Sequence, residues 1–236
     1  NPCVNAAVAG AAADTLHSGA VTASGKAATI PQATGKLLDA TKTFTICYAE
    51  MTGNATDTSW RDSYVRVRIS KIHTFSAHSV THKTYGSLAK TPALEITYAG
   101  SLAASMWVSM VDATLNNNFP CASGTVAAQA AGALNSPPNS PSSGVDQADG
   151  SKVVTFDTTK MHSSTVFAVC YAETDGTSTD STWGDSGHRL RVSLMESISS
   201  HSVTHITYGQ VAHVATLELT YAGTLSATAY VSLVDT

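Results

Sequence analysis

Charged side chains are scarce in this sequence. Of its 236 residues, 13 are Lys or Arg and 17 are Asp or Glu, which is 13% of the chain, against about 25% in a typical soluble domain. The net charge of −4 leaves no basic footprint, which excludes a nucleic-acid partner. Long apolar runs are also missing, and no stretch reaches the ~18 to 20 residues of a membrane helix. Neutral hydroxyls replace the charge, with 29 Ser and 32 Thr. They predict a surface solvated by hydroxyls or covered by another molecule.

Known catalytic motifs are absent as well. The sequence has no Gly-x-Ser-x-Gly, no Walker loop, no His-Glu-x-x-His and no dinucleotide-binding glycine pattern. We therefore expect that the protein is not an enzyme and needs no cofactor. A hydrolase that assembles its few carboxylates in three dimensions is the remaining catalytic alternative.

What the sequence does contain is one unit written twice. Residues 44–112 (copy 1) align with residues 167–235 (copy 2) without a gap, and 36 of 69 positions are identical. Each copy is preceded by a Pro-Cys pair and a poorly matched stretch rich in Ser, Ala and Gly. A tandem duplication explains this pattern. It predicts two domains, residues 1–113 and 119–236, joined by a connector at residues 114–118.

The hydrophobic pattern of both copies has a period of two, which is typical of strands. Val65, Val67 and Ile69 share one face, while Arg66 and Arg68 share the other. The other predicted strands are residues 36–41, 44–49, 94–98 and 107–111, and in copy 2 residues 153–157, 167–172, 189–194, 217–221 and 230–234. Residues 167–172 are apolar on both faces, which predicts a central strand. Short strands separated by Gly and Asp/Asn/Ser/Thr turns predict an all-β fold of two tandem β-sandwich units.

The layout of a strand, a polar corner and Phe-x-x-Cys-Tyr occurs at Phe44–Tyr48 and Phe167–Tyr171. It resembles the later strands of immunoglobulin-like domains in architecture. The resemblance implies an immunoglobulin-like sandwich. The spacing between cysteines is shorter than that family has, and Trp60 and Trp183 follow the second cysteine instead of preceding it.

The four cysteines lie at matching places, two in each unit. This arithmetic predicts the disulfides Cys3–Cys47 and Cys121–Cys170, with four buried free thiols as the alternative. Zinc is disfavoured because no Cys-x2-4-Cys pair is present. Disulfides form in oxidising compartments, so we expect an extracellular or cell-surface protein.

Three kinds of residue are weak candidates for binding. Histidines of the repeated His-Ser-Val-Thr-His could bind a metal, but on a strand they are too far apart to share one ion; they are His78, His82, His201 and His205. Oxygen-rich loops can hold Ca²⁺, and the candidates are Asp175, Asp180 and Asp185, which turn formation explains equally well. Trp60 and Trp183 beside these loops would stack on a sugar if exposed, or belong to the core if buried.

Glycosylation is also expected. Asn54-Ala55-Thr56 is an N-glycosylation sequon in a polar loop, and copy 2 has no sequon there. The Ser- and Pro-rich residues 135–143 are a candidate for O-linked sugar, or are only a surface loop.

These observations favour a secreted or cell-surface structural protein, the tandem-repeat subunit of an extracellular fibre, sheath or appendage. Its expected partner is another copy of itself, with glycans as a second partner. The alternative function is a carbohydrate- or ligand-binding adhesion module.

Overall fold

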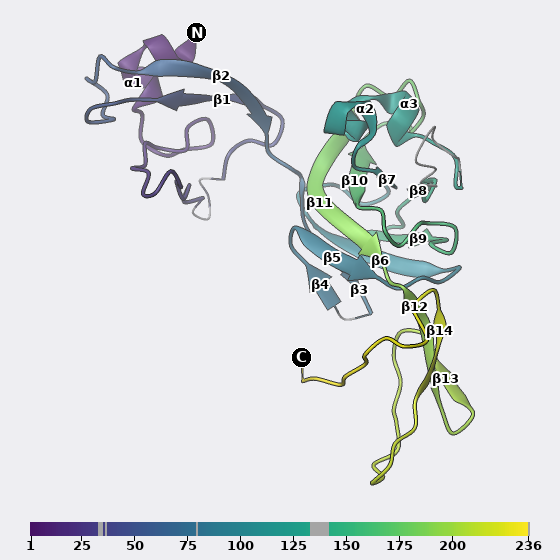
Figure 1. Ribbon diagram of the computed structural model, residues 1–236. Helices are drawn as coiled ribbons and strands as arrows, with labels where there is room; N and C mark the ends of the chain where they lie inside the picture. The colour runs from purple at the N-terminus through teal and green to yellow at the C-terminus, as the bar shows by residue number, and fades with distance from the viewer. Residues whose placement is uncertain (33–34, 36, 79, 133–141, 236) are drawn as a thin grey trace. The chain divides into compact units, whose positions relative to one another are not determined.

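The computed structural model describes residues 1–32, 35, 37–78, 80–132 and 142–235 (Figure 1). Strands in several sheets are the main secondary structure, and the helices are short. The expected all-β fold is therefore confirmed. The chain divides into two compact units, Asn1–Ser70 and Lys71–Thr236.

The N-terminal unit is a hairpin linked by a disulfide to the start of the chain. In chain order its elements are the 3-10 helix η1 (Pro2–Val4), helix α1 (Ala6–Ala9), and strands β1 (Thr43–Tyr48) and β2 (Arg61–Arg68). The side chain of Asn1 caps η1 by accepting from the N–H of Cys3 at 3.1 Å. The expected bridge Cys3–Cys47 then ties this turn to β1, which pairs only with β2 among the described strands.

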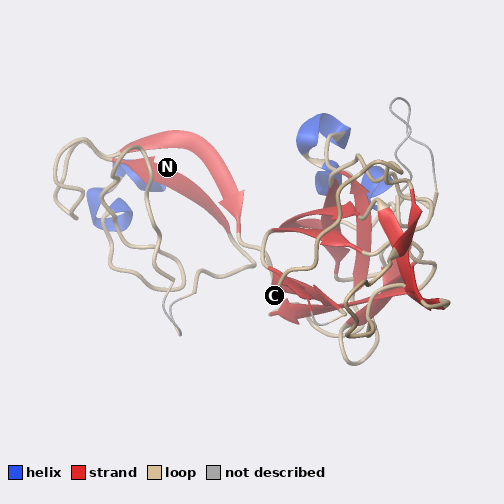
Figure 2. Ribbon diagram, turned by 60° about the horizontal axis from the view of Figure 1, so that its bottom comes forward, coloured by secondary structure: helices blue, strands red, loops and turns tan. Residues whose placement is uncertain are grey.

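The second unit contains a β-sandwich at residues 71–192, which we call the central sandwich (Figures 1 and 2). Its sheets have the strand orders β4-β3-β6-β9 and β5-β11-β10-β7-β8. The strands are β3 (Ile72–Ala77), β4 (Val80–His82), β5 (Tyr85–Leu88), β6 (Leu94–Gly100), β7 (Trp107–Asp112), β8 (Val145–Gln147), β9 (Val153–Phe156), β10 (Phe167–Ala172) and β11 (Gly184–Val192). The short helices are α2 (Leu115–Asn118), η2 (Pro120–Ala122) and α3 (Gly124–Ala127).

The main core lies between these two sheets because alternate strand residues point inward, with one register shift in β3 between Ile72 and Thr74. Its buried side chains come from both sheets: Ile72, Phe75, Leu94, Ile96, Tyr98 and Val154 from one, and Val108, Met110, Phe167, Val169 and Leu190 from the other. Burial of one such side chain is worth roughly 1.5–3 kcal/mol. The predicted central strand is confirmed, since β10 is the middle strand of its sheet and is buried on both faces. Its outer face packs on the bridge Cys121–Cys170 and Trp183.

The central sandwich takes one half from each of the two predicted domains, residues 1–113 and 119–236. The first half, residues 71–113, carries β3 to β7, and the second half, residues 120–192, carries β8 to β11. Four pairings join the halves: β7 with β10, β7 with β8, β6 with β9, and β5 with β11. The expected connector, residues 114–118, therefore lies inside the second unit and not between the two units. Asn116, Asn117 and Asn118 have positive φ there, which Asn tolerates better than most residues.

The same two halves occur again along the sequence, one before and one after the central sandwich. Residues 1–70 correspond to its second half, and residues 194–235 to its first half. We call them the N-terminal and C-terminal half-modules. The C-terminal half-module contains strands β12 (Met195–Ser200), β13 (Val203–His205) and β14 (Thr220–Gly223).

Each half-module keeps the pairings that are internal to its half. The partners Phe44↔Val67 in β1–β2 repeat Phe167↔Leu190 in β10–β11, and both ladders have the same register shift before the cysteine. Likewise β12–β14 repeats the register and the bulge of β3–β6. Each half therefore forms its own ladder without the other half.

Strands that need the other half are missing from the half-modules. Residues 230–234 are not a strand, although their equivalent is β7. Residues 217–219 are not in a strand either, whereas the equivalent part of β6 pairs with β9. The described residues 37–41 of the strand predicted at residues 36–41 are not in a strand either. The strand predictions are wrong at these three places for one reason: strand hydrogen bonds come from a partner strand, and the partner belongs to the other half. Residues 220 and 221 of the predicted strand 217–221 are confirmed, because they lie in β14.

Candidate functional site

A polar loop follows the cysteine strand in both copies, and a buried aspartate organises it. In copy 2, Asp180 accepts hydrogen bonds from the N–H groups of Asp175 (2.8 Å) and Gly176 (2.9 Å), and from the N–H (2.8 Å) and hydroxyl (2.6 Å) of Thr182. Asp57 makes the matching contacts in copy 1. Burial raises the pKa of Asp180, but these donors outweigh it and hold the pKa well below its usual range. Asp180 therefore acts as the anchor of its loop.

The other candidate calcium ligands also have local partners. The carboxylate of Asp175 accepts from the N–H (2.9 Å) and hydroxyl (2.8 Å) of Thr177, which makes a tight turn. Asp185 forms a two-point ion pair with Arg189, at 2.9 Å and 2.8 Å. Among the residues that the structure describes, no three His, Cys, Asp or Glu side chains gather as a metal site would require. The geometry of these loops is that of turns.

The tryptophans of both copies are buried against the same loops. Trp60 is 7% and Trp183 is 6% exposed. Each indole N–H donates to a loop carbonyl at 2.9 Å, of Asn54 and Thr177 respectively. Rings held in this way are enclosed and leave no open face for a sugar, and Trp183 packs with Cys121 and Cys170.

The repeated His-Ser-Val-Thr-His forms the end of a hairpin. In copy 2, His201 and Ser202 both have positive φ between β12 and β13, as a tight hairpin turn requires. In copy 1, His78 has positive φ as well, and Ser79 lies outside the described residues. His82 and His205 end the short strands β4 and β13. In each copy, therefore, the first histidine of the motif lies in the turn and the last histidine lies at the end of the following strand.

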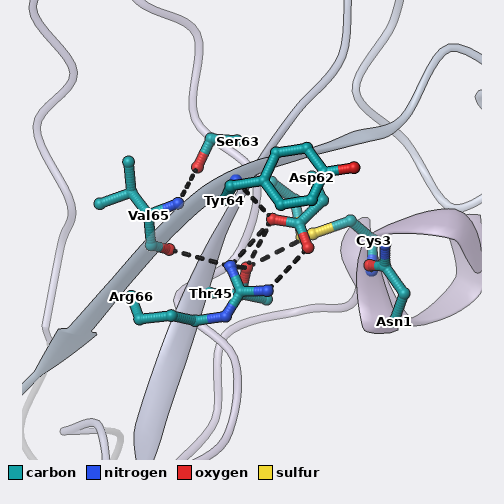
Figure 3. Close-up of polar contacts among 9 residues, drawn as sticks. Asn1, Cys3, Thr45, Asp62, Ser63, Tyr64, Val65 and Arg66 are labelled. Atoms are coloured by element: carbon teal, nitrogen blue, oxygen red, sulfur yellow. Dashed lines mark hydrogen bonds and ion pairs between the residues drawn. A yellow bond between two sulfur atoms is a disulfide. The ribbon is translucent and has the colours of Figure 1, made fainter.

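A carboxylate and an arginine meet at the bulge of the β1–β2 ladder, where the Sγ atom of Cys3 lies 3.9 Å from the hydroxyl of Thr45 (Figure 3). Asp62 forms a two-point ion pair with Arg66, at 2.9 Å and 2.8 Å, and accepts from the hydroxyl of Thr45 and the N–H of Tyr64. The hydrogen bonds from Arg66 hold the pKa of Asp62 well below its usual range. Asp185 and Arg189 repeat the pair in copy 2. Arg66 and Arg189 thus each stabilise the bulge of their own ladder through an ion pair with an aspartate of the same strand.

The sequon residue Asn54 is exposed, as glycosylation requires. Its side-chain oxygen accepts from the N–H (3.0 Å) and hydroxyl (2.9 Å) of Thr56. Of the Ser- and Pro-rich segment, residues 135–141 lie outside the described residues.

Sequence reasoning missed a buried histidine. His188 on β11 is 2% exposed, and its ring meets that of Phe75 edge to face at 4.8 Å. Nδ1 lies 3.2 Å from the carbonyl of Ser186, while buried Nε2 has no hydrogen-bond partner among the described residues. Burial lowers the pKa of His188, and the backbone carbonyl of Ser186 opposes this in part. The neutral ring with its proton on Nδ1 is the form that fits.

The central sandwich should lose stability in mild acid because of this ring. A histidine whose pKa is lowered by folding binds fewer protons in the folded state, so stability falls as the pH drops below about 6.5, by up to about 1.4 kcal/mol per pH unit. His188→Val introduces the residue of copy 1, Val65, and should flatten that slope. Denaturant unfolding of both proteins at pH 7.5, 6.5 and 5.5 measures it. Equal slopes in the two proteins would rule out His188 as the cause.

The largest feature that sequence reasoning missed is an apolar face on each half-module. In the C-terminal half-module, Met195, Ile198, Leu217, Leu219 and Tyr221 line a groove of about 270 Å³ with Val231 and Leu233. All seven correspond to core residues of the central sandwich that are at most 2% exposed. In the N-terminal half-module, Ile46 is 45% and Tyr48 is 47% exposed. Their equivalents, Val169 and Tyr171, are 1% and 6% exposed.

Comparison with known proteins adds no assignment. No protein-family model, curated protein or solved structure matches this chain. A search of the helices in the described part of the chain finds none that is both long and apolar enough to cross a membrane. The two disulfides are compatible with an extracellular location.

Proposed function

We propose that this chain is a structural protein of the extracellular space or the cell surface, a tandem-repeat subunit of a fibre, sheath or appendage. In this proposal each complete module is an immunoglobulin-like sandwich stapled by one disulfide. The observation that carries it is that the central sandwich takes one half from each predicted domain. A repeat that completes its core with the next repeat forms a continuous array, because no copy can bury its apolar face alone.

The surface chemistry supports the same proposal. Few charges have to be desolvated when Ser, Thr and Ala surfaces come together, so contact between subunits costs little. The exposed sequon at Asn54 suits a glycoprotein. The alternative of a sugar-binding module loses its aromatic platforms, because Trp60 and Trp183 are buried.

The test is the assembly state of the disulfide-bonded chain. We expect sedimentation velocity to show species that grow with concentration, and negative-stain microscopy to show extended particles. A monodisperse monomer at every concentration, with no particles by microscopy, would contradict the structural role.

A further inference from the structure

We propose that the C-terminal half-module of one chain docks on the N-terminal half-module of a second copy and completes a sandwich like the central one. This rests on the proposed function and names the partner and the contact of that assembly. The two half-modules correspond to the two halves that the central sandwich joins, so the central sandwich is a template for the contact. Three features support this docking mode: the strand register, the matching size of the apolar side chains, and an aromatic ring that would cover a loop glycine.

The template fixes the strand register. In the central sandwich, Val169 of β10 lies opposite Met110 of β7, and Tyr171 lies opposite Val108. The matching pairs are Ile46 with Leu233 and Tyr48 with Val231, and in the parallel pairing of β5 with β11 Gly86 and Leu190 become Gly209 and Val67. Residues 230–235 and 208–211 become strands when these partners are supplied. Their sequences already have the alternation of β7 and β5.

The apolar side chains keep the size that the template core needs. Phe167 and Tyr171 recur as Phe44 and Tyr48. Leu190 and Val192 become Val67 and Ile69, which together have the same number of side-chain carbons. Cores tolerate hydrophobic exchanges that conserve total volume. The groove on the C-terminal half-module is the place where these side chains would be buried.

One loop contact shows the same complementarity. In the central sandwich the Trp107 ring lies directly over Gly176, where an added Cβ would come within 2.6 Å of the ring. The equivalents are Tyr230 and Gly53. Tyr230 is fully exposed, and within the described part of the chain a Cβ added at Gly53 would meet only the Cβ of Ala20, at 3.9 Å. The exposed ring of Tyr230 in one copy can therefore cover the open surface at Gly53 of the other copy, as Trp107 covers Gly176.

One ion pair does not carry over. Lys71 Nζ lies 2.7 Å from Glu173 in the central sandwich, and the equivalents are Leu194 and Glu50. The contact between copies therefore depends on apolar burial and on strand hydrogen bonds. Its strength should consequently change little with salt concentration.

A cross-link between two variants tests the register. Ile46→Cys and Leu233→Cys are made separately in the full chain, oxidised together and separated on a non-reducing gel. Cα atoms of directly opposed residues in an antiparallel ladder lie about 4.5–5.5 Å apart, which a disulfide can span. We expect a mixed disulfide dimer whose linking peptides are identified by mass spectrometry. The matched control pairs Ile46→Cys with Val234→Cys, whose side chain points to the opposite face, and should lose the cross-link.

A charge on the apolar face gives an independent readout. Leu233 is 66% exposed, so Leu233→Lys should leave the fold intact and abolish the concentration-dependent association seen in sedimentation. Thr224→Lys adds the same charge at an exposed position whose template equivalent, Ser101, is also exposed, and should preserve association.

The outcomes separate this inference from the proposed function. An absent matched cross-link, or equal cross-links in the matched and shifted pairs, overturns the docking mode, and extended particles would then keep the structural role. If the double variant Ile46→Cys/Leu233→Cys closes only within single chains, the second copy is overturned as the partner. If the matched pair cross-links but only closed dimers form, the docking mode holds and the fibre role fails.

Discussion

Replacing Cys121 and Cys170 together with alanine is expected to lower the free energy of unfolding of the central sandwich by about 4 kcal/mol. The bridge spans 49 residues, and a cross-link of that length removes conformational entropy from the unfolded chain. Cys170 also lies in β10, the strand that joins both halves. Denaturant unfolding followed by circular dichroism measures the loss.

The matched control removes the other bridge, Cys3–Cys47. It lies in the other compact unit, so the unfolding transition of the central sandwich should stay within about 0.5 kcal/mol of the parent chain. A central transition that moves as far in this control as in the Cys121/Cys170 variant would contradict the independence of the two units.

Phe167→Ala is expected to cost about 4 kcal/mol of stability. Phe167 has no exposed surface and packs between the two sheets of the central sandwich. Removing its ring leaves a cavity at the point where β10 pairs with both β7 and β11. The same unfolding experiment, analysed for the central transition, gives the value.

Phe44→Ala is the matched control, because Phe44 is the same residue at the same strand position of copy 1. It lies in a two-stranded sheet and is only partly buried. In dilute protein its replacement should cost under about 1 kcal/mol, since little buried surface is lost. Equal losses for the two variants would show that both copies have a complete core, against the structure.

The sequence was sufficient for several strands and for both disulfides. Period-two patterns located β2 and β11, a run that is apolar on both faces located β10, and the number and placement of the cysteines gave both disulfides. These features depend on local alternation and on parity of cysteines. Each can be read within one stretch of chain.

The place where a module begins could not be found in this way. A repeat with a constant offset looks the same from any starting residue. The identity of copies 1 and 2 therefore does not show at which residue a folded module begins. The start of a module is set by pairings between strands that are distant in the sequence, such as β7 with β10, and no local sequence pattern indicates these pairings. Residues 217–219 and 230–234 of the predicted strands fail for the same reason, while residues 220 and 221 are confirmed as part of β14.

The candidate sites were found by residue type, and their roles were decided by burial. Asp180 and Trp183 stand out in the sequence because both recur as Asp57 and Trp60. Only the structure shows that the carboxylate is saturated with N–H and O–H donors and that the indole is enclosed. His188 has no signal of this kind, since copy 1 has Val65 at its position.

Hydrogen exchange of the full chain at low concentration tests most directly whether the complete module spans residues 71–192. The structure predicts that amides of β7 and β10 exchange only on global opening, while those of residues 230–235 and the β1 amides that face away from β2 exchange through small local openings. Equal protection of residues 107–112 and 230–235 in the dilute monomer would contradict this, because it would mean that each sequence copy completes a module by itself.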